Sequence, residues 1–288
     1  MKHTDRQRWR EPDYLAPVIF VVAVLIAAVL FWPYGKKPTE PVTEEPPAVL
    51  QDDLKLQGKT GEPQIQYPVP QETEKPGSAI TQPQQEFQPL PVLDKGKVSI
   101  EEEFRQLYDE QKFGGLFLLK NFIPNFVVTI DNMTGAKLSQ KYRFTKPPVG
   151  QFQAIKDVTG NEFIDPRNYG RYIPYIDLAE AVDIGRFVSF YVRYYALFQQ
   201  AYHDLGYLDR YFNDRFVQVL DHLLTAPEVR VPIQLVRPRV YYQFADPELD
   251  ALSAGQKILV RIGPDNAARV KARIRELRQA LTSLQSKK

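Results

Sequence analysis

An uncharged stretch of 18 residues, 15–32, most constrains what this chain can fold into. It reads LAPVIFVVAVLIAAVLFW, and as a helix it would span roughly 27 Å, close to the thickness of a hydrocarbon core. Tyr14, Trp32 and Tyr34 stand at its ends, where aromatic rings favour the headgroup level of a bilayer. We predict a transmembrane helix over residues 15–33, embedded in the lipid bilayer. The alternative, a buried core helix, would normally carry a polar face.

The charges on either side of this stretch predict its orientation. Basic residues are more numerous before it than after it: Lys2, Arg6, Arg8 and Arg10 against Lys36 and Lys37. Because positive residues stay on the cytoplasmic side, we expect residues 1–14 in the cytoplasm of a bacterium and the rest of the chain in the periplasm, anchored in the inner membrane. A cleaved signal peptide is disfavoured, since the stretch is long and lacks a small-residue cleavage pattern.

A proline-rich segment follows, from residue 34 to residue 93. Of the 24 prolines in the chain, 12 fall between residues 33 and 93. Such a composition, rich also in Glu, Gln, Thr and Lys, buries too little apolar surface to offset the entropy lost on ordering. We therefore predict a disordered tether, whose roughly 60 residues would give a coil a spread of about 40 Å.

The remaining residues, 94–288, have the pattern of one folded domain. Apolar residues at intervals of three and four predict helices over 100–113, 116–134, 184–205, 212–223, 253–262 and 265–284. The clearest β signal is a hairpin of residues 152–156 and 162–164, near a short extended stretch at 142–144. Residues 235–244 are a further candidate for extended structure. The expected fold is mainly α, a multi-helix domain with a small antiparallel β-hairpin region (α+β), preceded by the transmembrane helix and the linker.

Four segments of this domain carry a family resemblance: Phe126–Asn132, Asn168–Tyr172, Gly206–Tyr207 with Phe212–Arg215, and Gln256–Ala267. They resemble the bacterial envelope family catalogued as domain of unknown function 3014, and the likeness covers nearly all of residues 98–284. The resemblance implies a membrane-anchored architecture and an envelope location. It carries over no catalytic residue.

The sequence offers little for catalysis or for cofactor binding. Phosphate loops, nucleophile elbows, zincin motifs and EF-hand loops are absent, and the chain has no cysteine. His203 and His222 each adjoin an aspartate and are interpreted as exposed polar positions on helices rather than metal ligands. Acidic residues that could include a glycosidase-like pair are Asp165, Asp177, Asp183, Asp209 and Asp214. We expect no cofactor, and a non-enzymatic role is favoured over the alternative, a hydrolase of cell-wall polymer.

Arginine and tyrosine side chains suggest two candidate partner-binding surfaces, because these residues often anchor interfaces. The first comprises Arg171, Tyr172, Tyr175, Arg193 and Tyr194, with core packing as the alternative for the tyrosines. The second comprises Arg269, Lys271 and Arg275, which a helical projection directs away from the apolar seam and into solvent. A solvated basic face without a partner is the alternative for this second set.

The charge balance narrows the class of partner. Residues 94–288 hold 28 basic and 23 acidic residues, an excess too small and too dispersed to indicate nucleic acid. We therefore expect an inner-membrane-anchored periplasmic binding or scaffolding module of the cell envelope, with an envelope protein or peptidoglycan as its partner.

Overall fold

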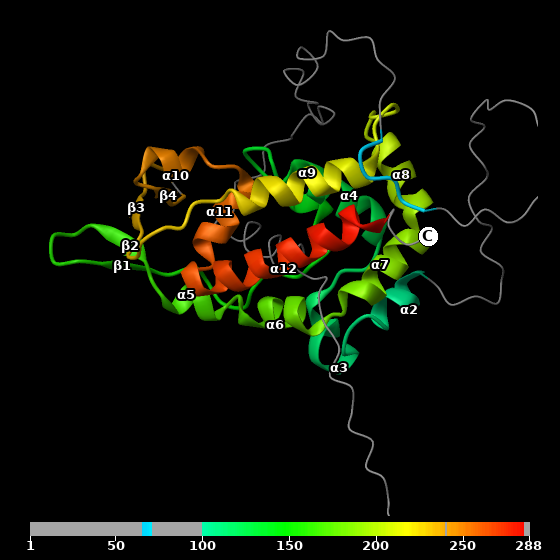
Figure 1. Ribbon diagram of the computed structural model, residues 1–288. Coiled ribbons are helices and arrows are strands. Elements are labelled where there is room, and N and C mark those ends of the chain that lie inside the picture. Colours follow the sequence, from blue (N-terminus) through cyan, green and yellow to red (C-terminus); the bar gives the residue numbers. More distant parts are fainter. Residues whose placement is uncertain (1–64, 71–99, 240, 285–288) are drawn as a thin grey trace, which may run out of the picture.

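The computed structural model describes residues 65–70, 100–239 and 241–284 (Figure 1). The predicted transmembrane helix, residues 15–33, lies outside the described residues, as does most of the predicted tether. Within the described residues, no helix is both long and apolar enough to cross a bilayer. The membrane span and the domain boundaries therefore stay predictions.

Eleven α-helices and a four-stranded antiparallel sheet make up the described fold, which confirms the mainly helical α+β class. In Figure 1 the sheet and α10 lie at one end of the molecule, and α12 runs through the helical part between α9 and α6. The helices are α2 (Ile100–Arg105), α3 (Glu110–Phe113), α4 (Phe122–Asn132), α5 (Arg167–Gly170), α6 (Ile173–Ala181), α7 (Ile184–Arg193), α8 (Tyr195–His203), α9 (Phe212–Leu224), α10 (Pro247–Ala251), α11 (Ala254–Arg261) and α12 (Pro264–Thr282). Short 3-10 turns occupy Gly114–Leu116 and Gln140–Tyr142.

The sheet begins with the predicted hairpin, which is confirmed. Strands β1 (Ala154–Lys156) and β2 (Glu162–Ile164) pair antiparallel. Asp157 stabilises the turn, since its Oδ1 accepts the N–H groups of Thr159 and Asn161, both at 2.9 Å. This is an Asx-type turn, in which a side chain replaces main-chain pairing.

Two further strands extend the sheet in a way that the local pattern did not predict. Strands β3 (Gln234–Val236) and β4 (Gln243–Phe244) give the order β1-β2-β3-β4, all neighbours antiparallel. Ile164, Leu235 and Phe244 lie buried on the same face in a small core of their own. Predicted extended structure over 235–244 is thus two short strands rather than one. Of the stretch at 142–144, Tyr142 ends a 3-10 turn, whereas Arg143 has extended backbone and precedes an isolated bridge between Phe117 and Thr145.

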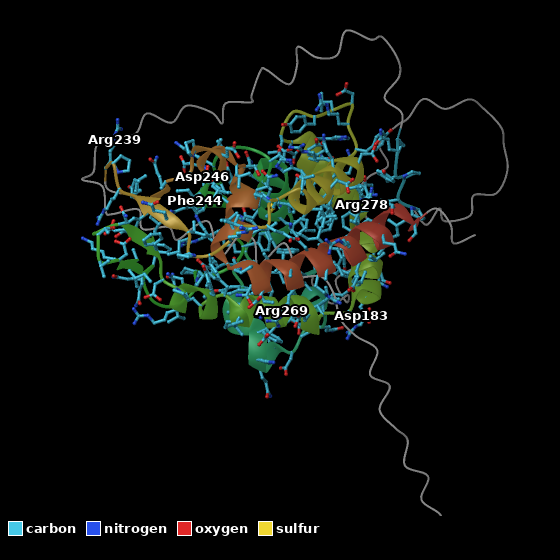
Figure 2. All side chains as sticks on the ribbon, turned by 60° about the vertical axis from the view of Figure 1, so that its left-hand side comes forward. Asp183, Arg239, Phe244, Asp246, Arg269 and Arg278 are labelled. Carbon is cyan, nitrogen blue, oxygen red and sulfur yellow. The ribbon has the colours of Figure 1, made fainter. Side chains whose placement is uncertain are left out.

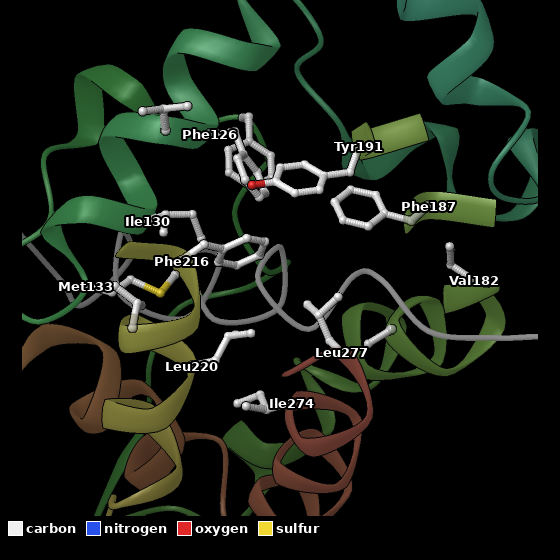
Figure 3. Packing of buried hydrophobic residues seen from close by; sticks show 14 of the residues in the cluster. Phe126, Ile130, Met133, Val182, Phe187, Tyr191, Phe216, Leu220, Ile274 and Leu277 are labelled. Carbon is white, nitrogen blue, oxygen red and sulfur yellow. The ribbon is translucent and has the colours of Figure 1, made fainter. Parts of the chain in front are cut away.

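Helix α12 forms the centre of the main core. Its seam of Val270, Ile274, Leu277 and Leu281 is 0% exposed, as the spacing of these residues predicted. The helix packs against α9, α6, α7 and α11, and Figure 3 shows Ile274 and Leu277 on the side of Leu220 from α9. Each fully buried aliphatic side chain contributes about 1.5–3 kcal/mol relative to an exposed one.

Aromatic rings fill the other half of this core (Figure 3). Phe126 of α4 lies at their meeting point, with ring centroids 5.6 Å from Phe198 and 5.7 Å from Phe216. Both pairs are edge-to-face, the geometry that the ring quadrupole favours. Helix α4 thereby joins α8 and α9, which pack on it.

Three predicted helices differ from the structure. The helix expected over 100–113 is divided into α2 and α3, because Asp109 caps α3 by accepting the N–H groups of Gln111 and Lys112. The helix expected over 184–205 breaks at Tyr194, with φ −101° and ψ 12°. The helix expected over 116–134 starts only at Phe122, after Asn121 with φ 56°. In each case both pieces face one core, so the apolar period continues across the break.

Candidate functional site

The candidate site lies at the start of α9, where a short irregular segment of the chain docks. Helix α9 has no capping side chain of its own, and α8 satisfies its first N–H groups instead. Gln199 Oε1 accepts the N–H of Phe212 at 2.8 Å, and the Tyr195 hydroxyl accepts the N–H of Asn213 at 3.3 Å. These bonds fix the first turn of α9 against α8.

Asn213 is the buried polar residue of this site. Its side chain is 0% exposed, and its Oδ1 accepts a hydrogen bond from the Tyr191 hydroxyl at 3.2 Å. Its Nδ2 donates to the main-chain carbonyl oxygen of Tyr67 at 2.8 Å. Because an unpaired buried amide is costly, this carbonyl completes the hydrogen bonding of Asn213.

Asp214 holds the same segment from its other side. Its carboxylate oxygens accept the main-chain N–H groups of Gln66 at 3.0 Å and Tyr67 at 2.8 Å. Hydrogen bonds to a charged acceptor are roughly twice as strong as neutral ones. Three main-chain groups of Gln66 and Tyr67 are therefore bound by two neighbouring side chains of α9.

We call residues Ile65–Pro70 the docked segment, and Asn213, Asp214 and the core surface beside them the docking surface. Tyr67 and Val69 are partly buried against the main core, whereas Ile65 stays 41% exposed. In Figure 1 the docked segment, in cyan, lies beside α8. The Tyr67 phenol also adds to the raised pKa of the Arg278 guanidinium, whose main cause is the hydrogen bond that Arg278 donates to Asp221.

The first predicted partner-binding set is mostly structural. Tyr172 and Tyr175 are buried in the core, and burial raises the pKa of Tyr175 to about 12 while its hydroxyl donates to the carbonyl oxygen of Lys146 at 3.0 Å. The interpretation that these tyrosines line an open cleft is therefore wrong. Arg171 is half-buried and donates to the carbonyl oxygens of Val149 and Gly150.

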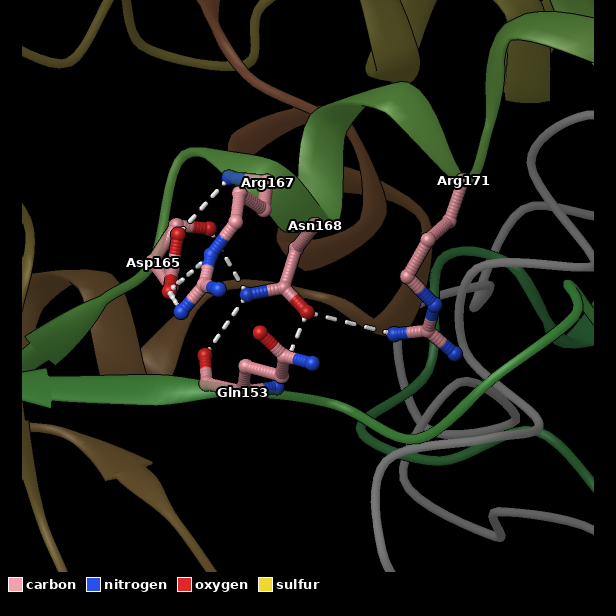
Figure 4. A network of polar contacts seen from close by, with 5 residues as sticks. All are labelled: Gln153, Asp165, Arg167, Asn168 and Arg171. Atoms are coloured by element: carbon pink, nitrogen blue, oxygen red, sulfur yellow. Dashed lines mark hydrogen bonds and ion pairs between the residues drawn. The ribbon is translucent and has the colours of Figure 1, made fainter.

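Arg171 also belongs to the polar network of Figure 4, which joins the hairpin to α5. Asn168 is buried and pairs with both main-chain groups of Gln153, at 3.0 and 2.6 Å. Arg167 donates its main-chain N–H and its Nε to Asp165, both at 2.8 Å. The hydrogen bond from the Arg167 side chain holds the pKa of the Asp165 carboxyl below its usual value.

Arg193 and Tyr194 do come together, on a shared acid. Arg193 Nη1 lies 2.7 Å from Glu103 Oε1, and the Tyr194 hydroxyl donates to Glu103 Oε2 at 2.6 Å. Burial and this hydrogen bond raise the pKa of Tyr194 to about 12. The pair thus ties the α7–α8 break to α2, and its predicted partner-binding role is untested.

The three residues of the second predicted set, on α12, have different surroundings in the structure; Figure 2 labels Arg269 among them. Arg269 pairs with Glu180 at 2.6 Å and Asp177 at 3.1 Å, both from α6. Lys271 is only 7% exposed, and its Nζ donates to the carbonyl oxygen of Ala226 at 2.5 Å. The prediction that Lys271 is solvated is wrong, because its long stem reaches the C-terminal end of α9, where carbonyl groups attract a cation. Arg275 is exposed, as predicted.

The acidic and histidine candidates for chemistry also have structural partners. Asp183 caps α7 by accepting the N–H of Arg186 at 2.8 Å. His222 is half-buried and lies 2.9 Å from Ser253 Oγ, so its predicted exposure is wrong, as is that of the half-buried His203. Burial lowers the pKa of His222. Over the part of the chain that the structure describes, no three His, Asp or Glu side chains are grouped to hold a metal ion.

Fold and site together define a mainly helical α+β domain that binds a short segment of its own chain. Residues 122–278, more than half of the chain, match the family described as "Protein of unknown function (DUF3014)". The chain therefore belongs to this family, as the resemblance in the sequence indicated. The match runs from the first residue of α4 into α12 and includes Asn213 and Asp214. No curated protein and no solved structure matches the chain.

Proposed function

We propose that this protein is an inner-membrane-anchored binding or scaffolding module of the bacterial cell envelope. The uncharged stretch over residues 15–32 and the excess of basic residues before it support an anchor with a cytoplasmic N-terminus. A proline-rich tether would then hold the domain in the periplasm, within reach of an envelope protein or of peptidoglycan.

The single observation that carries the binding role is the docked segment. Asn213 and Asp214 bind three main-chain groups of a short peptide segment, while two of its side chains pack on the core. Main-chain hydrogen bonds combined with side-chain contacts are the usual means by which domains recognise extended peptides. The domain thus carries a surface suited to peptide binding.

The alternative, a hydrolase of cell-wall polymer, has weaker support. Such an enzyme needs one carboxyl as acid and another as base or nucleophile on either side of a sugar bond. Asp165 is paired with Arg167, and Glu180 with Arg269, and the hydrogen bond from the partner arginine lowers the pKa of each carboxyl. Lowered pKa values suit structural ion pairs better than a proton donor at neutral pH.

Location and activity are tested in parallel. The full chain should sediment with membranes, and protease added to spheroplasts should cleave the domain while leaving intact cells unaffected. Extracts of the envelope passed over the full chain should yield a specific protein or glycan partner, and purified peptidoglycan should not be turned over. A domain protected in spheroplasts would contradict the orientation. Release of muropeptides, lost in an Asp165→Asn variant, would favour the hydrolase.

A further inference from the structure

We propose that the docking surface is a recognition site for short, proline-flanked peptides of other proteins, and that the docked segment occupies it as a built-in competitor. This inference rests on the proposed function in one respect, that the domain binds peptides. It adds the class of partner and the means by which binding is controlled.

The hydrogen bonds of the site do not distinguish the chain's own segment from a foreign one. All three go to main-chain groups, the N–H of Gln66 and both the N–H and the carbonyl oxygen of Tyr67. Gln66 and Tyr67 lie in a bend of the backbone, which brings both N–H groups to one carboxylate, and segments of other proteins can form such a bend. A segment of another protein can therefore replace the docked segment without any loss of main-chain pairing.

Side chains supply the selectivity of the surface. The docked segment reads Ile-Gln-Tyr-Pro-Val-Pro, and its Tyr67 and Val69 are the side chains that pack on the core. Pro68 and Pro70 follow these residues, and a proline biases the residue before it toward extended backbone. It also offers no N–H that would be left unpaired. The site accordingly favours a motif of aromatic residue, proline, aliphatic residue and proline.

The size of the contact makes the docked segment exchangeable. Three hydrogen bonds and two partly buried side chains are far fewer contacts than a stable interface between separate proteins makes. Residues 71–99 connect the segment to α2, and a short connection gives an effective concentration of about millimolar. The docked segment therefore occupies the docking surface although its contact is weak. A partner with a better-fitting or multivalent motif displaces the docked segment.

Asn213 gives a reason why the surface needs an occupant. Its side chain is fully buried, and Tyr67 supplies the acceptor for its Nδ2. Removal of the segment leaves this amide and the Asp214 carboxylate without those partners. The domain is thus more stable with a peptide bound than with a bare surface.

A competition experiment on the full chain in detergent micelles tests the proposal. The probe is a fluorescent 12-residue peptide that copies residues 62–73, EPQIQYPVPQET. The variant Tyr67→Ser/Val69→Ser changes only the docked segment and so vacates the surface while the domain sequence stays intact. We expect this variant to bind the probe at least about tenfold more tightly than the parent chain. A probe with serine in place of its tyrosine should not bind.

Changes in the domain show where the probe binds. In the vacated variant, the further change Asp214→Asn should weaken probe binding about tenfold, because a neutral amide replaces the charged acceptor of two N–H groups. Asp209→Asn, an exposed acid just before α9, is the matched control and should leave binding unchanged.

Other outcomes overturn the inference. Equal binding to parent and vacated chains would show that the docked segment is no competitor, and binding to neither would show that the surface recognises no peptide in trans. Concentration-dependent dimers of the parent, lost in the vacated variant, would mean that segments exchange between copies instead. Failure of the proposed function remains distinguishable: a chain that is not exported but still binds the probe would lose the envelope role and retain the peptide site.

Discussion

Helix α12 and the docked segment both pack on the other helices of the domain, and they are held in different ways. Four side chains of α12 are 0% exposed and fill the centre of the core. The docked segment contributes two partly buried side chains and relies on three main-chain hydrogen bonds. Apolar burial on the scale of α12 makes a permanent part of the fold, whereas the docked segment has the contacts of a ligand.

The charged side chains of α12 and of the docking surface also differ in what they bind. On α12, Arg269 pairs with Glu180, Arg273 with Glu276 and Arg278 with Asp221, so most bases of this helix serve the domain itself. At the docking surface, Asp214 binds main-chain groups of a separate segment. Most basic residues of α12 are therefore structural. Asp214, at the start of α9, instead binds a peptide segment.

The largest effect is expected from Ile274→Asp in α12. This substitution buries a carboxylate among apolar side chains, so the free energy of unfolding should fall by about 4 kcal/mol or more. Urea denaturation followed by circular dichroism measures the change. Arg275→Gln, on the neighbouring exposed position, is the control and should cost less than about 0.5 kcal/mol. Similar midpoints for both variants would mean that α12 is not part of the cooperative core.

A smaller loss is expected from Lys271→Gln. The shorter amide cannot reach the carbonyl oxygen of Ala226, so a buried acceptor loses its partner and stability should fall by about 1–3 kcal/mol. The same denaturation series compares it with Arg275→Gln. Equal losses of stability in Lys271→Gln and Arg275→Gln would show that Lys271 is solvated.

A substitution in the docked segment should change the free energy of unfolding still less, but should have a clear effect on local amide protection. Tyr67→Ser should lower the free energy of unfolding by less than about 1 kcal/mol, because the segment adds little buried area. Hydrogen exchange should nevertheless show lost protection at the amides of residues 66 and 67. Gln66→Ser keeps the main-chain donor and alters only an exposed side chain, so its amides should stay protected. Unprotected amides in the parent would contradict the docking itself.

The smallest effect concerns pH and His222. Burial lowers the pKa of this imidazole from its ordinary value of 6.5, so the unfolded chain binds more protons than the folded one once pH falls below that value. Stability should therefore decline from pH 6.5 downward and level off below the folded pKa. His222→Gln should remove this part of the decline in urea midpoints between pH 7.5 and 5. Glu180, with its pKa lowered from 4.5, titrates below this window and does not contribute to it. If the urea midpoint of His222→Gln declined with pH as steeply as that of the parent chain, His222 would not be the cause of the decline.

Local signals in the sequence were enough for much of the fold. Residues 152–156 and 162–164 predicted the hairpin, and the seam of α12 was evident from its spacing. The break at Tyr194 was not predictable from periodicity, because residues on both sides face one core. The addition of β3 and β4 to the hairpin depends on pairing across some 70 residues, for which no local pattern exists.

The candidate site was harder to predict than the fold. Composition identified the region around Tyr67 as tether, and only the apolar side chains between its prolines distinguish the docked segment from its neighbours. Asn213 and Asp214 stood out only as part of a family segment, with Asp214 also one of several acidic candidates, and their role depends on a segment about 147 residues away. Conversely, Lys271 looked solvated because a helical projection ignores how far a lysine stem can reach.

The central place of α12 has a consequence for the order of events in synthesis. Its partners α6, α7 and α9 all precede it in the chain, and the face that each turns toward α12 stays uncovered until residues 264–282 have been made. A nascent chain that stops at Gly263 therefore presents open apolar surface to chaperones and proteases rather than a folded domain. Quality control can thus distinguish finished from unfinished molecules by the presence of a single helix.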